Sequence, residues 1–135
     1  MKRNVISFIF LIVLLQACKK IEGVGGDASI HGKVYFKHYN STFTTLLNEG
    51  MYPDTYVYII YGDNINYGQR IKTNYNGEFE FKYLYKGNYR IYTYSVDSAA
   101  LVNGVLSPPP QAVVSEVTIS KRKDKMDVGT ISVYN

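Results

Sequence analysis

Few residues in this 135-residue sequence have the type and spacing that chemistry requires. Its two histidines, His31 and His38, lie seven residues apart, and on an extended strand they would point to opposite faces. Glu78 and Glu80 would share one strand face, where two carboxylates could act as acid and base. Because cations surround them in the sequence, we expect a solvated ladder of charges instead. The sequence predicts no catalytic residue, no metal ligand and no cofactor.

The single cysteine, Cys18, stands directly behind a segment that has the layout of an export signal. Lys2 and Arg3 provide positive charge, and residues 5–15 form an apolar run broken by one serine. With a cysteine at the point of cleavage, this segment resembles the signal of bacterial lipoproteins. The resemblance implies that residues 1–17 are a removed signal peptide and that Cys18 carries acyl chains.

Two alternatives to lipidation of Cys18 are a transmembrane anchor and an ordinary secretory signal with a coincidental cysteine. The apolar run has about half of the roughly 20 residues that a membrane span needs, and two or more acyl chains would hold the protein firmly on a membrane. We therefore expect a lipid-anchored protein of the bacterial cell envelope. Lys19, Lys20 and the Tyr- and Asn-rich composition resemble lipoproteins of the Bacteroidota. We expect an outer-membrane location, in either the periplasmic or the surface leaflet.

The 118 residues that remain after removal of residues 1–17 are enough for one domain. Without the signal, the net charge falls from +4 to about +2, which does not indicate nucleic acid as a partner. The dense basic run over residues 121–125 is expected to be a solvated turn, with contact to anionic lipid headgroups or glycans as the alternative. The only cysteine is used for the anchor, so no disulfide can form in the domain. Fourteen tyrosines and six phenylalanines favour β-structure.

Alternating apolar and polar residues predict about seven short strands and hence an all-β sandwich. The predicted strands cover residues 28–36, 55–61, 69–73, 78–82, 89–94, 113–120 and 127–134.

The segments between and before these strands complete the expected domain plan. The glycine-rich residues 18–27 are predicted to be the lipidated cysteine and a flexible tether, so that the sandwich occupies residues 28–135. Residues 38–53 are expected to hold a short helical turn or an irregular loop. Residues 97–111, which end in three prolines, should run extended over the surface.

One stretch of the sequence has a more specific pattern, with Asn76 and Gly77 as a strong hairpin signal. Its residues are Thr73, Gly77, Phe79, Phe81, Leu84, Gly87, Tyr89 and Ile91. This pattern resembles the central hairpin of the carboxypeptidase regulatory-like, transthyretin-like family, which implies an Ig-like or prealbumin-like sandwich. Both phenylalanines, Tyr89 and Ile91 should then face the core, and Leu84 should close one end.

The same alternation directs a second set of aromatic residues outward. If Tyr89 and Ile91 face the core, then Arg90, Tyr92 and Tyr94 face solvent, and Tyr56 and Tyr58 are expected on an outer face too. Exposed tyrosines can anchor a protein partner or stack against sugars. The alternative is that a tyrosine-rich β protein has tyrosines on both faces, or that loops cover them.

We therefore predict a lipid-anchored, non-enzymatic envelope module. Its expected role is structural or protein-binding within an outer-membrane or surface assembly, and the alternative is a carbohydrate-binding lipoprotein that uses the exposed tyrosines. A small hydrolase is a third hypothesis, which the missing histidine and nucleophile motifs disfavour.

Overall fold

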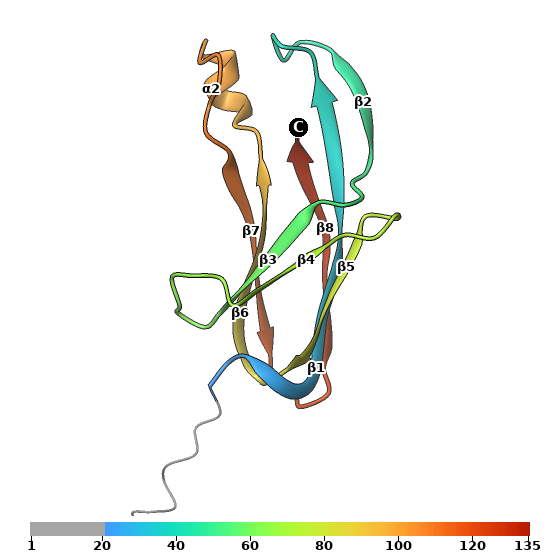
Figure 1. The fold of residues 1–135 in the computed structure, drawn as a ribbon, viewed down its shortest axis with the longest axis vertical. Coiled ribbons are helices and arrows are strands. Elements are labelled where there is room, and N and C mark those ends of the chain that lie inside the picture. Colours follow the sequence, from blue (N-terminus) through green and yellow to red (C-terminus); the bar gives the residue numbers. More distant parts are fainter. Residues whose placement is uncertain (1–20) are drawn as a thin grey trace, which may run out of the picture.

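Two four-stranded sheets pack face to face in this protein (Figure 1), and the computed structural model describes residues 21–135. The first sheet contains β1 (Val24–Tyr39), β2 (Leu46–Met51), β5 (Glu78–Leu84) and β8 (Lys125–Tyr134). The second contains β3 (Tyr56–Tyr61), β4 (Gln69–Lys72), β6 (Gly87–Ser95) and β7 (Gln111–Ile119). The all-β sandwich is confirmed, with eight strands where the sequence indicated about seven.

The long strand β1 organises the first sheet. Its first half pairs antiparallel with β5, its second half pairs antiparallel with β2, and β8 runs parallel along its other edge. Ile30 lies opposite Phe81 on one side, and Val34 lies opposite Ile131 on the other. At Gly32, between them, a side-chain carbon would come within 2.8 Å of the Phe79 ring. The missing side chain therefore lets the strands pack closely over the core.

The second sheet has the order β4-β3-β6-β7, and the chain passes between the sheets at its tight turns. Asn76 and Gly77 form the predicted turn, with Gly77 at φ +70°, a conformation that glycine adopts without strain. The predicted hairpin is wrong, however, because β4 pairs with β3 while β5 pairs with β1. The turn is a corner between sheets. The Asn74 side chain holds it by accepting hydrogen bonds from the backbone N–H groups of Asn76 and Glu78, each at 2.9 Å.

The core lies where the two sheets face each other, and the predicted inward residues occupy it. Phe79, Phe81, Leu84, Tyr89 and Ile91 are all buried, together with Ile30, Val34, Val57, Ile59, Ile119, Ile131 and Val133. Aliphatic and aromatic side chains from both sheets thus close the sandwich. The hydroxyl of Tyr89 remains hydrogen-bonded inside it, to the carbonyl of Tyr85 at 2.7 Å.

Three local predictions were wrong. Residues 24–27, predicted as tether, are the beginning of β1, and Gly26 packs so closely on the Leu84 carbonyl that a side-chain carbon would lie 2.0 Å from its oxygen. Residues 46–51 form strand β2 rather than a helical turn or loop. The connection after β6 contains a short helix, α2 (Ser98–Val102), in which the Asp97 side chain accepts a hydrogen bond from the backbone N–H of Ala100 at 3.0 Å.

The predicted signal peptide and Cys18 lie outside the described residues. Within residues 21–135, none of the helical structure is long and apolar enough to cross a bilayer.

Candidate binding surface on the second sheet

The outer face of the second sheet carries five tyrosines that touch one another. Strand alternation buries Val57 and Ile59 of β3 and turns Tyr56 and Tyr58 outward. The register sets Tyr58 directly opposite Tyr92 of β6, and Tyr94 follows on the same face. Tyr67, from the loop between β3 and β4, adds a fifth ring. We call Tyr56, Tyr58, Tyr67, Tyr92 and Tyr94 the tyrosine face.

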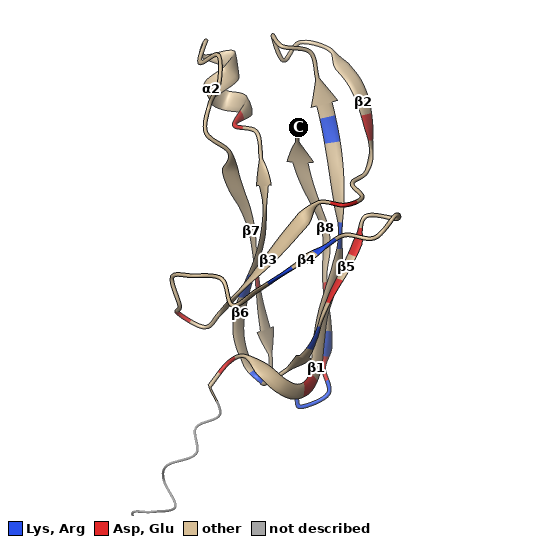
Figure 2. Cartoon of the chain, viewed as in Figure 1, with Lys and Arg blue, Asp and Glu red and all other residues tan. Residues whose placement is uncertain are grey.

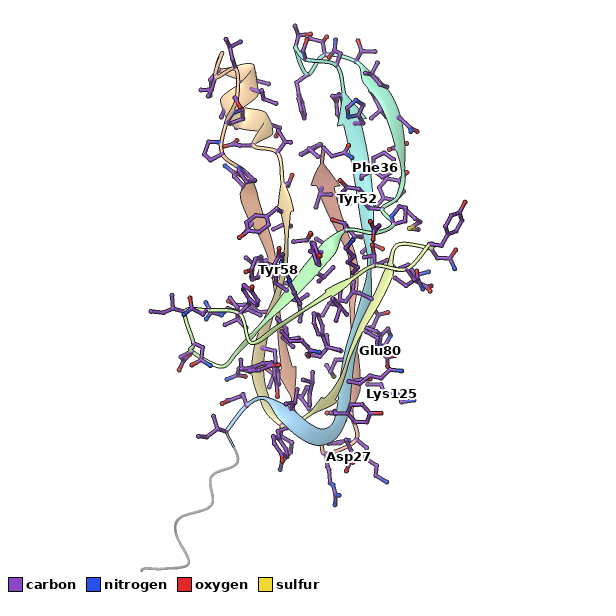
Figure 3. The ribbon with its side chains drawn as sticks, in the orientation of Figure 1. Asp27, Phe36, Tyr52, Tyr58, Glu80 and Lys125 are labelled. Atoms are coloured by element: carbon purple, nitrogen blue, oxygen red, sulfur yellow. The ribbon has the colours of Figure 1, made fainter. Side chains whose placement is uncertain are left out.

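Tyr58 is the centre of the tyrosine face (Figure 3). Its ring stacks on Tyr92 with centroids 4.8 Å apart and planes 10° from parallel. Tyr67 and Tyr94 meet it edge to face at 5.1 Å and 5.6 Å. Offset-stacked and edge-to-face contacts at these distances are the favourable arrangements of aromatic rings. The rings therefore hold one another in a fixed arrangement.

Tyr92 was expected to be exposed, and this expectation was wrong. It lies on the outer side of the sheet, as alternation requires, but only 9% of it is accessible because neighbouring rings cover it. This burial, together with the nearby Tyr94, raises the pKa of Tyr92 to about 12. Tyr92 therefore packs beneath the exposed rings and is not itself accessible to a ligand.

Three rings of the tyrosine face remain open to solvent. Tyr56 is 39% exposed, and Tyr67 and Tyr94 are each 47% exposed. Val114 of β7, opposite Tyr92 in the register, adds an exposed aliphatic side chain beside them. The exposed rings thus surround a packed aromatic centre.

Two cations of β4 border the tyrosine face. The Arg70 guanidinium lies 4.5 Å from the centroid of the Tyr56 ring, and the Lys72 ammonium lies 5.1 Å from it. Such contacts attract a cation to the negative face of the ring. Lys72 also forms an ion pair with Asp54 at 2.7 Å, whereas Arg70 has no ion pair among residues 21–135. Arg70 therefore contributes an uncompensated positive charge at the edge of the surface.

Arg90 does not join the tyrosines, although the sequence placed it with them. Its guanidinium donates hydrogen bonds to the backbone carbonyls of Asn64, at 2.6 Å, and Gly62, at 3.4 Å. Arg90 thus fastens the loop between β3 and β4. Tyr67, Arg70 and Lys72 belong to or border this surface and were not predicted from the sequence. Arg70 and Lys72 could have been found, because alternation along residues 69–73 puts both on one face.

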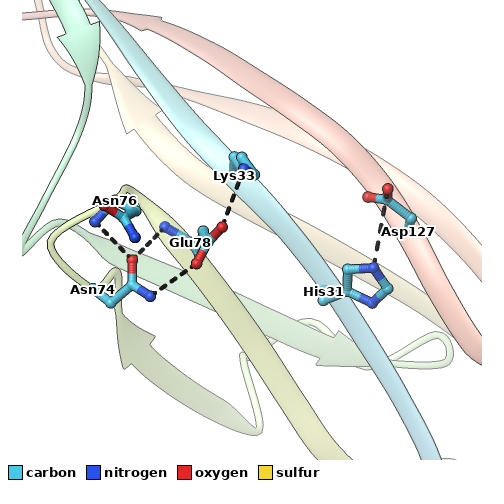
Figure 4. A network of polar contacts seen from close by, with 6 residues as sticks. All are labelled: His31, Lys33, Asn74, Asn76, Glu78 and Asp127. Atoms are coloured by element: carbon cyan, nitrogen blue, oxygen red, sulfur yellow. Dashed lines mark hydrogen bonds and ion pairs between the residues drawn. The ribbon is translucent and has the colours of Figure 1, made fainter.

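A concavity of about 800 Å³ lies along the outer face of the first sheet and reaches Ile71 and Lys72 at β4 of the second sheet; Glu78, Glu80 and several lysines are among the residues that line it. Glu78 pairs with Lys33 at 3.1 Å (Figure 4), and Glu80 pairs with Lys82 at 3.2 Å. Hydrogen bonds from Asn74 and then Lys33 lower the pKa of Glu78. The predicted charge ladder is confirmed, with Lys33 and Lys82 as the cations that pair with the two glutamates.

The two histidines have separate surroundings. His31 lies on the outer face of the first sheet, with its Nε2 atom 4.0 Å from a carboxylate oxygen of Asp127. His38 lies near the end of β1, with Nδ1 2.7 Å from the backbone oxygen of Asn135. In the described part of the chain, no three His, Cys, Asp or Glu side chains are grouped so that they could hold a metal ion.

No family model matches the chain, and no curated protein matches its sequence. Among solved structures, a protein of Pseudomonas aeruginosa described as a candidate carbohydrate-binding protein is 13% identical, with a TM-score of 0.47 over 90% of this chain and 94% of that one. A 9R-lipoxygenase of Cyanothece is 16% identical, with a TM-score of 0.39 over 94% of this chain and 20% of that one. At these similarities neither structure assigns a ligand or an activity to this chain.

Proposed function

We propose that this chain is a lipid-anchored, non-enzymatic module of the bacterial envelope, and that the tyrosine face is where it docks to a protein of a larger outer-membrane or surface assembly. The observation that carries this proposal is the fixed cluster of five touching tyrosines beside Arg70. Tyrosine and arginine are the residue types most enriched among the side chains that dominate binding energy at protein interfaces.

Preorganisation also favours the tyrosine face as a docking surface. Tyr58 is held on three sides by other rings, so its side chain has little rotational freedom left to lose on binding. The exposed parts of Tyr56, Tyr67 and Tyr94 can then be covered by a partner, while the buried Tyr92 keeps the centre in place. Arg70 would favour a partner that brings a carboxylate to this edge.

Photo-crosslinking in intact envelopes tests the docking role. A photoreactive phenylalanine analogue replaces Tyr94 in one variant and Tyr75 in the matched control. Tyr75 is 91% exposed in the turn after β4 and lies outside the tyrosine face. We expect a discrete crosslinked protein from position 94 only. Equal crosslinking from the two positions, or none from position 94, would contradict a partner on this face.

The anchoring part of the proposal depends on Cys18. The basic and apolar segment before it and the absence of other cysteines support acylation at this residue. Cells are fed a clickable fatty acid, and the full chain is compared with its Cys18→Ala variant. We expect labelling of the first and loss of labelling in the second. Equal labelling of both would exclude acylation at Cys18.

Carbohydrate binding is the second candidate function, because three tyrosine rings are open and an arginine lies beside them. A sugar can stack its apolar face on an exposed ring while a guanidinium binds its hydroxyl groups. Affinity electrophoresis in gels that contain envelope polysaccharides distinguishes the candidates. A shift that Tyr94→Ala removes and Tyr75→Ala retains favours a sugar ligand, whereas the absence of any shift favours the protein partner.

A further inference from the structure

We propose that the end of the sandwich from which the N-terminus leaves is a contact surface for anionic lipid headgroups. We call this surface the basal end and define it by five cations on two neighbouring turns and the first position of β8: Lys86, Lys121, Arg122, Lys123 and Lys125. The bilayer's expected position rests on the proposed acylation of Cys18, but the experiment below does not depend on it.

The basic turn between β7 and β8 lies against the beginning of β1. Arg122 contacts Asp27 through its Nε atom at 2.7 Å, and the backbone carbonyl of Asp124 accepts a hydrogen bond from Ser29 at 2.9 Å. Lys and Arg colour this turn at the end of the molecule where the described residues begin (Figure 2). The basic run and the first described residues are therefore at the same end of the sandwich.

The chain between the expected anchor and the folded domain is short. Gly23 is fixed in the sandwich, because its backbone N–H donates to the hydroxyl of Tyr89 at 3.1 Å. Four residues lie between Cys18 and Gly23, which makes five residue-to-residue steps, and a fully extended chain spans at most about 3.6 Å per step. An acylated Cys18 would thus keep the basal end within roughly 20 Å of the headgroups. Lysine side chains on the turns shorten this distance further.

Most of the cations at the basal end have no carboxylate partner. The Asp124 carboxylate accepts hydrogen bonds from the backbone N–H groups of Ser120 and Lys121, at 3.2 Å and 2.8 Å, and so holds the turn. Asp27 pairs with Arg122. Across residues 21–135, no ion pair involves Lys86, Lys121, Lys123 or Lys125. Glu22 lies close by, beside the turns at Gly62 and Gly87, and Lys125 lines the same concavity as Glu80 and Asp127 without an ion pair to either.

An exposed aromatic side chain completes the basal end. Tyr83, at the end of β5, is 68% exposed, and its backbone has φ +61°, which non-glycine residues seldom adopt. Tyrosine favours the interface between membrane and water, where its ring meets the headgroups and its hydroxyl stays wet. Lysines near an anionic bilayer each strengthen partition by about fivefold, and the effect weakens within a Debye length.

Vesicle sedimentation of the processed chain tests this surface without the anchor. Residues 18–135 contain every strand and core residue that the structure describes, and Cys18→Ser removes the acylation site; circular dichroism checks the fold. The vesicles are phosphatidylcholine alone or with about one third phosphatidylglycerol. The test variant is Lys121→Gln/Lys123→Gln. The matched control, Lys33→Gln/Lys37→Gln, removes the same charge from β1.

We expect the chain to bind the anionic vesicles and not the neutral ones. The test variant should lose about tenfold or more in partition, and the control no more than about twofold. Salt at about 0.5 M should abolish binding because it shortens the Debye length to a few ångströms. Equal binding to both vesicle types, or equal losses in the two variants, would overturn the proposal. If the fatty acid does not label Cys18, the proposed anchor is refuted, but the result of the vesicle-binding experiment is unaffected.

Discussion

The hydroxyl of Tyr89 joins the first described residues of the chain to the middle of the second sheet. It accepts a hydrogen bond from the backbone N–H of Gly23 at 3.1 Å and donates one to the carbonyl of Tyr85 at 2.7 Å. The phenol ring itself is buried in the core. The start of the domain is therefore fixed by a core residue, and any tether to a membrane must end before Gly23.

Replacing Tyr89 by phenylalanine should cost about 1–2 kcal/mol, because the buried N–H of Gly23 loses its acceptor while the ring packing stays intact. Urea unfolding followed by circular dichroism measures this change. Tyr83→Phe removes a hydroxyl at an exposed position and should change the free energy of unfolding by less than about 0.5 kcal/mol. Equal costs for the two variants would mean that the hydroxyl of Tyr89 does not fix the N-terminal residues.

Truncating Phe81 should be the more damaging change. Its side chain is fully buried, and its ring contacts Phe79 with centroids 6.1 Å apart. Phe81→Ala should cost about 3–5 kcal/mol, since a cavity replaces the ring. The domain has no disulfide to offset the loss. The control is Tyr75→Ala, at a position 91% exposed. A melting temperature within a couple of degrees of wild type would contradict the placement of Phe81 in the core.

The core could be predicted from the sequence because alternation is a local property. Phe79, Phe81, Tyr89 and Ile91 alternate with polar residues, so their direction follows once the segments are extended. Which sheet each strand joins is not local information. The turn at Asn76 and Gly77 looks the same whether it closes a hairpin or carries the chain between sheets, and only packing decides.

The two strand segments that the sequence analysis missed have misleading compositions. Residues 46–51 lack β-branched side chains and do not alternate, and they become a strand because β1 continues far enough to pair with them. Residues 24–27 looked like a flexible linker because of their glycines. In the fold, Gly26 is required by the close approach of the Leu84 carbonyl. Likewise, the burial of Tyr92 depends on rings from other segments.

The corner between the sheets should depend on Asn74 rather than on Asn76. The Asn74 side chain accepts two backbone hydrogen bonds and donates to the Glu78 carboxylate at 3.1 Å. We expect Asn74→Ala to lower the free energy of unfolding by about 1–2 kcal/mol. Asn76→Ala, two residues away in the same turn, should cost less than about 0.5 kcal/mol. Denaturant unfolding of the two variants measures these costs. A larger cost for Asn76→Ala than for Asn74→Ala would refute the role of Asn74 in the corner.

The buried centre of the tyrosine face should make the protein sensitive to alkali. The pKa of Tyr92 is about 12 in the folded protein, against an ordinary value of 10.0. Below pH 10 both folded and unfolded chains keep the proton, so the full contribution of Tyr92 to stability is present. Between pH 10 and 12 the unfolded chain ionises first, and the free energy of unfolding falls. Above pH 12 both states are ionised and no further loss from Tyr92 follows.

Tyr92→Phe isolates this contribution, because phenylalanine keeps the ring and cannot ionise. We expect the fall in the free energy of unfolding between pH 9 and 11 to be smaller in this variant than in the wild type. It should not vanish, since burial also raises the pKa values of Tyr61 and Tyr89. Tyr75→Phe, at a position 91% exposed, is the control and should leave the pH dependence unchanged. If Tyr92→Phe also leaves it unchanged, then Tyr92 ionises freely in the folded protein and the packed centre of the tyrosine face is open to water.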